Sequence, residues 1–185
     1  MKLGKNSFIN KFSNVYSKKS CNSLIDWFEK NKHLSEPGGA GDKLLNNLEI
    51  CIRITPENNY FNLDKTLFNC TKKFKKIYPE VDKHLGRWNI DPFMQLACYE
   101  PNNFYNYIHC ENGGDPKYIN RVFAWMIFLN TIEKGGGTYF KYQNITAKPI
   151  AGDLYIWPAG WTHFHQGVRA PKEKKYILTG WYNYI

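Results

Sequence analysis

The stretch WTHFHQGVRAPKEKKYILTGW, Trp161–Trp181, places two histidines shortly before a strand that contains a lysine. His163 and His165 are two residues apart, so both side chains would project to the same face of an extended chain. Lys175 shares a face with Thr179 in a segment otherwise rich in aromatic and aliphatic residues. Burying an ammonium group is unfavourable unless an anion meets it. The stretch therefore predicts either a lysine at the exposed first position of a strand or a buried lysine that meets an anionic ligand.

The second half of the chain has the pattern of many short strands. Its strand-like segments are rich in aromatic and β-branched residues and cover residues 93–100, 121–132, 137–142, 151–158, 164–169 and 175–185. Glycine-rich turns separate several of them. Short strands that follow a helical first part predict a mainly β protein, a β-sandwich or jelly roll with helices packed against one side.

The first part of the chain carries helical periodicity in two places. Residues 22–34 have apolar side chains at helical spacing after Ser23, which we expect to cap the helix. Residues 63–85 repeat the pattern until Pro79 interrupts it. The Pro- and Gly-rich residues 35–43 between them predict a loop.

Composition favours one folded domain. The chain has 185 residues, of which 43% are hydrophobic and 17% aromatic, and this excludes a disordered protein. We expect a single domain over residues 1–185, with helical support over about 1–90 and the jelly-roll core over about 91–185. The formal net charge of +9 would favour an acidic partner. The lysines are scattered, however, and the cluster at residues 72–76 is typical of a solvated helix face.

The cysteines and the N-terminus indicate the compartment. Five cysteines without CxxC spacing predict reduced thiols rather than a disulfide framework. The first 20 residues lack the apolar run of a signal peptide, and no stretch is apolar enough to span a membrane. The sequence therefore predicts a cytoplasmic protein without a membrane partner, and it does not predict the oligomeric state.

His109 and Glu111 in the segment IHCEN supply the first chemical inference. On an extended chain the two side chains project to one face. A histidine from a distant strand would complete two imidazoles and one carboxylate, a set that suits Fe(II) with open coordination positions. Alternation alone leaves both His163 and His165 as candidates for that third ligand. A dicarboxylate that chelates the iron at one end would meet Lys175 at the other.

In order along the chain, these segments resemble the Fe(II)/2-oxoglutarate-dependent oxygenases, in particular the prolyl 4-hydroxylase-like branch. The family pattern is H-x-D/E, a distal histidine, and a lysine or arginine ten residues further on. Lys175 lies ten residues after His165, whereas an acid, Glu173, lies ten residues after His163. The resemblance therefore selects His165 as the metal ligand.

The resemblance extends over about residues 93 to 182. ACYEP resembles the family strand whose tyrosine, here Tyr99, precedes the first metal histidine by about ten residues. RVFAWMIFLN, EKGGGTYF and AGDLYIWP are similar to the three family strands and hairpins that follow. The chain departs from the family in having Glu111 in place of Asp, Phe128 in place of Tyr, and Gln166 where some relatives have Arg.

The strand pattern and the resemblance together assign eight residues to a site. These are the metal ligands His109, Glu111 and His165, the co-substrate contacts Tyr99, Lys175 and Thr179, and the substrate-pocket residues Arg121 and Trp181. The resemblance implies a double-stranded β-helix (jelly roll) that uses Fe(II), 2-oxoglutarate and O₂, and it makes ascorbate a further candidate.

The implied activity is hydroxylation of a substrate C–H bond, coupled to conversion of 2-oxoglutarate to succinate and CO₂. The substrate would be a prolyl residue, another peptide side chain or a free amino acid. Oxidative demethylation of nucleic acid is an alternative that the basic charge permits, although no aromatic and basic strip for stacking bases is evident. A non-catalytic cupin-like module that binds a metal or ligand is a second alternative.

Overall fold

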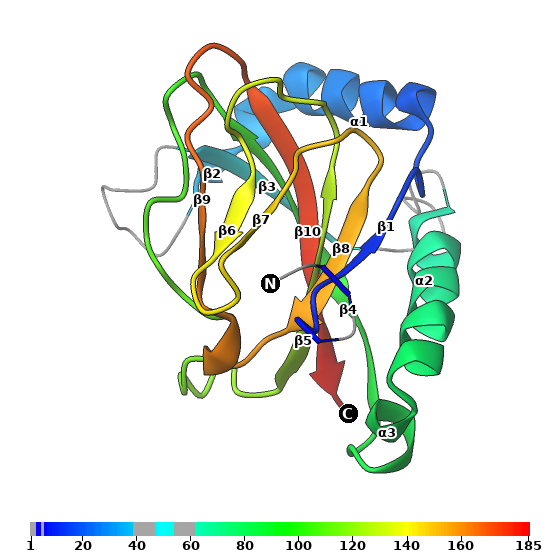
Figure 1. Cartoon of the computed structure of the whole chain (residues 1–185). Coiled ribbons are helices and arrows are strands. Elements are labelled where there is room, and N and C mark those ends of the chain that lie inside the picture. The colour runs from blue at the N-terminus through cyan, green and yellow to red at the C-terminus, as the bar shows by residue number, and fades with distance from the viewer. Residues whose placement is uncertain (1–2, 5, 39–46, 54–61) are drawn as a thin grey trace.

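The computed structural model describes residues 3–4, 6–38, 47–53 and 62–185, and Figure 1 shows how their helices and strands are arranged. In the first half these are β1 (Asn10–Phe12), α1 (Lys18–Lys30), the 3₁₀ helix η1 (Lys32–Leu34), β2 (Glu36–Pro37), β3 (Asn47–Arg53), α2 (Leu63–Ile77) and α3 (Pro79–Lys83). The second half contains β4 (Trp88–Tyr99), β5 (Arg121–Phe128), β6 (Thr138–Phe140), β7 (Ile145–Ala147), β8 (Leu154–Pro158), the 3₁₀ helix η3 (Trp161–His163), β9 (His165–Gly167) and β10 (Lys175–Tyr184).

The strands form two sheets. The larger sheet has the order β1-β8-β5-β10-β4-β3-β2, and the smaller one has the order β7-β6-β9. Strand β10, red in Figure 1, runs through the middle of the large sheet and pairs antiparallel with β4 and β5. Because β10 is covered on both faces, it reads as a nearly continuous apolar run. The predicted mainly β fold with a helical layer is confirmed.

The side chains on the two faces of the large sheet belong to two separate hydrophobic clusters. On one face, Trp125 and Leu178 pack with the buried side chains of α1 and α2. On the other face, Ala124 and Ile177 pack with side chains of the small sheet, such as Phe140. Strand alternation separates the two sets, and the functional site lies on the face toward the small sheet.

The helices follow their apolar periodicity. In α2 the buried residues Leu63, Leu67, Cys70 and Phe74 recur every three or four positions. The predicted start of α1 at Ser23 is wrong. The helix begins at Lys18, and the side chain of Ser17 accepts a hydrogen bond from the backbone nitrogen of Ser20. Several serines in this segment have the same capping capacity, so spacing alone did not select the correct one.

Strands β1, β2 and β3, which we did not predict, extend the large sheet at its two edges. The alternation in β3 was readable, because Ile50 and Ile52 are buried while Cys51 and Arg53 between and after them are exposed. The three-residue β7 was also not predicted. Of the predicted loop 35–43, residues 39–43 lie outside the described part of the chain.

A close approach at Gly152 joins the N-terminal segment to the large sheet. The backbone nitrogen of Val15 donates to the Gly152 carbonyl at 2.8 Å. Gly152 has a φ of +83°, and a Cβ atom at this position would lie 2.2 Å from the carbonyl oxygen of Tyr16. Only glycine fits this turn without displacing the backbone.

Two further observations concern the cysteines and the helices. All five cysteines are free, as predicted. Within the described ranges, the helices are too short or too polar to cross a bilayer.

Candidate metal centre and its cavity

A two-way backbone bridge brings His109 and His165 together. The backbone nitrogen of His109 donates to the His165 carbonyl at 3.0 Å, and the backbone nitrogen of His165 donates to the His109 carbonyl at 2.8 Å. His165 opens β9, whereas His109 lies in the long segment between β4 and β5. The bridge fixes two segments that are far apart in sequence, and their imidazole rings lie 4.3 Å apart between centroids.

Both imidazoles are oriented by backbone carbonyls. The Nδ1 atom of His109 lies 3.0 Å from the Tyr107 carbonyl oxygen, and the Nδ1 atom of His165 lies 2.9 Å from that of His163. A carbonyl only accepts, so each Nδ1 carries the proton in these contacts. In the neutral imidazole each Nε2 then has the lone pair, and this is the tautomer that binds a metal through Nε2.

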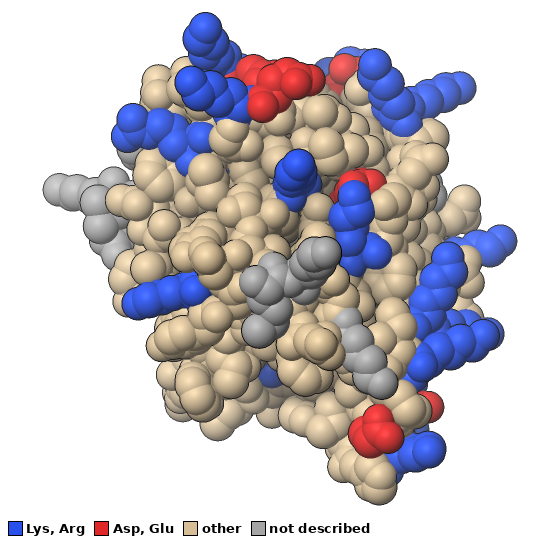
Figure 2. All heavy atoms as spheres, in the orientation of Figure 1, with Lys and Arg blue, Asp and Glu red and all other residues tan. Residues whose placement is uncertain are grey.

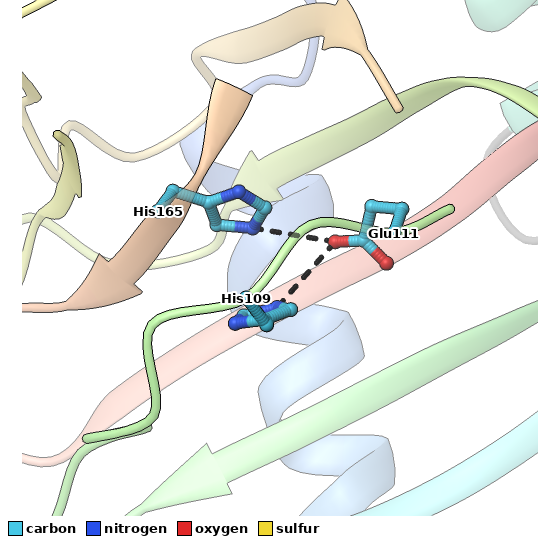
Figure 3. A group of neighbouring side chains, drawn as sticks. All are labelled: His109, Glu111 and His165. Carbon is cyan, nitrogen blue, oxygen red and sulfur yellow. Dashed lines mark ion pairs between the residues drawn. The ribbon is translucent and has the colours of Figure 1, made fainter. Parts of the chain in front are cut away.

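Glu111 faces both Nε2 atoms. Its Oε1 lies 3.7 Å from Nε2 of His109 and 3.3 Å from Nε2 of His165, as the dashed lines in Figure 3 mark. Burial alone would raise the pKa of Glu111, but the two histidines beside it outweigh that effect and hold its pKa well below the usual value. Burial would lower the pKa of His109, and the Glu111 carboxylate raises it instead. The carboxylate is therefore ionised.

The donor set fits a divalent metal. One ligand atom from each of His109, Glu111 and His165 lies within 4.8 Å of the other two. Two neutral imidazoles and one carboxylate on one side of an ion leave other positions open, which suits non-haem Fe(II). The arrangement therefore accommodates the iron that the sequence predicts.

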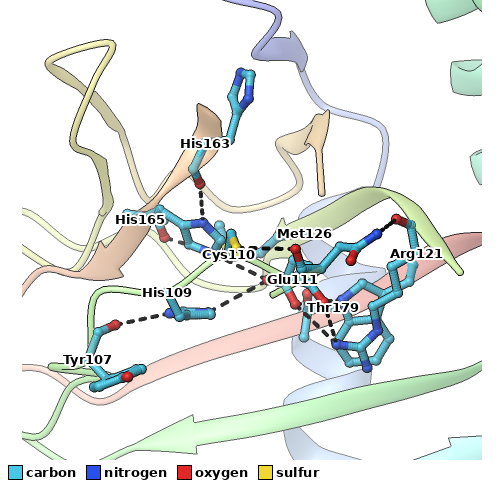
Figure 4. A network of polar contacts seen from close by, with 12 residues as sticks. Tyr107, His109, Cys110, Glu111, Arg121, Met126, His163, His165 and Thr179 are labelled. Atoms are coloured by element: carbon cyan, nitrogen blue, oxygen red, sulfur yellow. Dashed lines mark hydrogen bonds and ion pairs between the residues drawn. The ribbon is translucent and has the colours of Figure 1, made fainter. Parts of the chain in front are cut away.

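The other oxygen of Glu111 is held from the opposite direction. The Nε1 atom of Trp181 donates to Oε2 at 2.7 Å, and Nη1 of Arg121 lies 3.4 Å from the same oxygen. Figure 4 shows the Arg121 side chain on the side of Glu111 away from the histidines. The Arg121 guanidinium stacks 3.6 Å from the Trp181 ring centroid and 4.1 Å from that of Tyr118.

His163 is turned away from this group. It lies in η3, where the backbone is not extended, so the expectation that His163 and His165 share one face does not apply. The Nε2 atom of His163 lies 3.0 Å from the Ser7 carbonyl oxygen, and its Nδ1 lies 2.9 Å from Oγ1 of Thr162. Both ring nitrogens therefore have partners in the fold.

The eight residues predicted for the site line one cavity of about 570 Å³, the site cavity. Lys175 is only 3% exposed there, and its Nζ lies 4.3 Å from the ring centroid of Tyr99. Among the described residues, no carboxylate lies within ion-pair distance of it. Burial lowers the pKa of Lys175 to about 8. The charged form of Lys175 is therefore desolvated, which is costly unless an anion pairs with it.

Tyr99 and Thr179 differ in what they offer a ligand. Tyr99 is buried beside Lys175, its partner in the β4–β10 ladder. Oγ1 of Thr179 donates to the Trp125 carbonyl at 2.8 Å, so its proton is already engaged. Thr179 presents only acceptor lone pairs to the site cavity in this arrangement.

Other residues at the site were not predicted. A second hollow of about 310 Å³, the outer hollow, shares Gln95, Tyr118, Arg121 and Trp181 with the site cavity and continues to Asp91 and Phe93. Trp157 also lines the site cavity, and its buried Nε1 has no hydrogen-bond partner among the described residues. Its aromatic strand favoured a place in the core over one at the pocket. Phe128 is fully buried and packs edge-on against Tyr155.

A jelly roll with two imidazoles and one carboxylate in its cavity has the architecture of mononuclear non-haem iron proteins. Residues 94–183 match the family model of the 2OG-Fe(II) oxygenase superfamily. The match supports Fe(II), 2-oxoglutarate and O₂ as the groups that such a site uses. No curated protein sequence matches the chain significantly.

Solved structures share the fold over nearly the whole chain. The viral collagen prolyl hydroxylase of Paramecium bursaria Chlorella virus-1, in a complex with 2-oxoglutarate, is 19% identical with a TM-score of 0.72, and the match covers 96% of each chain. A prolyl hydroxylase of Trichoplax adhaerens, in complex with a hypoxia inducible factor peptide fragment, is 15% identical with a TM-score of 0.71 over 96% of this chain and 84% of that one. A Pseudomonas putida prolyl-4-hydroxylase is 15% identical with a TM-score of 0.67 over 96% and 93%. The fold is therefore that of the prolyl 4-hydroxylase-like branch.

Proposed function

We propose that this protein is a dioxygenase that uses Fe(II) and 2-oxoglutarate to hydroxylate a side chain of a peptide substrate, most specifically a prolyl residue. The observation that carries the proposal is the convergence of His109, Glu111 and His165 on the wall of a cavity that also holds the buried Lys175. A module that only bound a metal would have little use for the desolvated ammonium.

The chain's own residues would divide the work as follows. The Nε2 atoms of His109 and His165 and Oε1 of Glu111 would hold the ion. Lys175 would pair with the far carboxylate of 2-oxoglutarate, and the neighbouring Tyr99 would help to hold the same group. Bound Fe(II) would supply activation of O₂ for oxidative decarboxylation. The cavity between the sheets would exclude bulk water from this chemistry.

The outer hollow supports a substrate longer than a free amino acid. It shares the lining residues Arg121 and Trp181 with the site cavity, so a chain that reached the metal would have a neighbouring surface on which to extend. Exposed apolar side chains such as Tyr107 and Ile119 lie in the segment between β4 and β5, which also carries the metal ligands His109 and Glu111. The Trichoplax relative is in complex with a peptide, which is consistent with a substrate of this kind.

The charge distribution supports a nucleic-acid substrate less well than a peptide substrate. The clustered lysines of residues 72–76 lie on α2, which packs on the face of the large sheet opposite the site cavity. In Figure 2 several basic side chains gather at the right-hand edge, where α2 lies, and the others are spread over the face in view. A nucleic acid held by the α2 lysines would be far from the metal ligands.

The test is oxygen transfer to a peptide. The iron-loaded protein is incubated with 2-oxoglutarate and a library of proline-containing peptides, and mass spectrometry monitors the gain of one oxygen atom together with succinate. We expect hydroxylation of a prolyl residue in a subset of peptides, lost when 2-oxoglutarate is omitted. Parallel reactions without ascorbate test whether it is required. Succinate formed only with methylated nucleic acid, or no turnover with any substrate, would contradict the proposal.

A further inference from the structure

The two carboxylate oxygens of Glu111 have different sets of partners. Oε1 faces the two histidines, whereas Oε2 accepts from Nε1 of Trp181 at 2.7 Å and lies 3.4 Å from Nη1 of Arg121. A distance of 2.7 Å is that of a strong charge-assisted hydrogen bond. The same contacts therefore keep Oε2 away from the place where the ion would lie.

Glutamate needs this restraint more than aspartate does. Its side chain has one more rotatable bond, so its carboxylate has more freedom to lose when it binds an ion. An unrestrained carboxylate can also bind a metal through both oxygens, and this would occupy a position that a co-substrate needs. A donor fixed on Oε2 prevents both effects.

The two donors are themselves fixed. Trp181 is held by β10, where it pairs with Ala124 of β5. The Arg121 guanidinium lies over the rings of both Trp181 and Tyr118, at 3.6 Å and 4.1 Å from their centroids. This stacking leaves the guanidinium little freedom. Asn112, next to Glu111, donates to the carbonyls of Ile119 and Arg121 and so ties the Glu111 segment to the start of β5.

We propose that Trp181 and Arg121 are positioning residues that hold Glu111 so that it binds the metal through Oε1 alone. The inference rests on the metal site proposed above. It gives Trp181 and Arg121 a role in metal binding in addition to the place at the substrate that the sequence predicted. Because both residues also line the outer hollow, the wall that meets a substrate would be the same wall that holds the metal ligand.

The test compares two Trp→Phe variants of the same sheet. Trp181→Phe keeps an aromatic ring for Arg121 but removes the N–H that Oε2 accepts. Trp125→Phe is the matched control, because Trp125 lies on the helix-facing side and its Nε1 has no hydrogen-bond partner among the described residues. Both variants are checked by thermal unfolding, and Co(II) affinity is measured by competition with a chelator.

We expect Trp181→Phe to weaken Co(II) binding about 10–100-fold and to change the visible absorption spectrum of bound Co(II). Trp125→Phe should bind Co(II) as the wild type does. Arg121→Gln, which removes the longer contact, should cause a smaller loss. Wild-type affinity and spectrum in folded Trp181→Phe would overturn the positioning role alone, whereas absence of Co(II) binding by the wild type would overturn the metal site as well.

A double-mutant cycle with Glu111→Asp tests the same contact in a second way, and Arg121→Gln keeps the proposal testable if Trp181→Phe proves unstable. The shorter side chain cannot span the same distance between Trp181 and the histidines, so removal of the N–H should matter less in the Glu111→Asp background. Independent losses that multiply would contradict a contact between the two side chains that serves the metal.

Discussion

Replacement of Lys175 by methionine should stabilise the protein in the absence of co-substrate. Burial lowers the Lys175 pKa from 10.5 to about 8, and at 1.36 kcal/mol per pKa unit this corresponds to about 3 kcal/mol against the charged form at neutral pH. The cation–π contact of Lys175 with the Tyr99 ring offsets about 2 kcal/mol of this cost at most. Methionine has a similar length and no charge, so we expect the free energy of unfolding to rise by about 1–3 kcal/mol.

The difference should depend on pH in a defined direction. The folded-state pKa of about 8 lies below the unfolded value of 10.5, so between these values the unfolded chain binds more protons. The destabilisation by Lys175 is therefore complete below about pH 8 and disappears as the pH rises through 10.5. Urea unfolding of wild type and Lys175→Met, at pH values from 7 to 10, should show the two curves converging at high pH.

Addition of 2-oxoglutarate to the metal-loaded proteins should reverse the order of stability. A ligand at about 1,000 times its dissociation constant stabilises the folded state by about 4.1 kcal/mol, and only the wild type retains the ammonium that pairs with the dicarboxylate. Two results would refute this reasoning. One is a lower free energy of unfolding for Lys175→Met than for the wild type without co-substrate. The other is an equal increase in that free energy for both proteins when 2-oxoglutarate is added, because Lys175 would then not bind the anion.

Three other outcomes follow from the same geometry. His165→Ala should abolish metal binding and succinate formation, whereas His163→Ala should retain both with a loss of stability, because His163 bonds to Ser7 and Thr162 instead of facing the site; the reverse result in metal titrations would refute the ligand assignment. The affinity for 2-oxoglutarate should fall by up to about tenfold per pH unit above pH 8, because binding must then supply a proton to Lys175, and calorimetry in buffers of different ionisation enthalpy would detect that proton. Gly152→Ala should lower the free energy of unfolding by about 1–3 kcal/mol, since it strains a φ of +83° and meets the Tyr16 carbonyl; an unchanged urea midpoint would contradict this.

The arrangement of the second half of the chain was predictable because strand alternation is a local property. Lys175, Thr179 and Trp181 alternate along β10, and the structure does place all three on the same cavity. The N-terminal edge strands were missed for different reasons. In β3 the alternation was present but short, whereas β1 has only three residues and depends on pairing with β8, which no local pattern encodes.

The site was predictable in its residue types but not in its contacts. His109 and Glu111 lie on one side as an extended chain would place them, although His109 forms only an isolated bridge there. The orientation of His165 by the His163 carbonyl, and the contact of Trp181 with Glu111, depend on the packing of separate segments. Such contacts arise from the register between β5 and β10 and from the long loop before β5, and local periodicity carries no signal for them.

Anaerobic calorimetry of Mn(II) and 2-oxoglutarate binding tests the central claim most directly, because it measures the metal and the dicarboxylate without requiring the substrate. One ion per chain should bind, and 2-oxoglutarate should bind strongly only after the ion is present. Loss of the ion in Glu111→Ala and loss of only the co-substrate in Lys175→Met would agree with a single shared cavity. Equal binding of 2-oxoglutarate with and without the metal, or no metal binding by the wild type, would contradict the account.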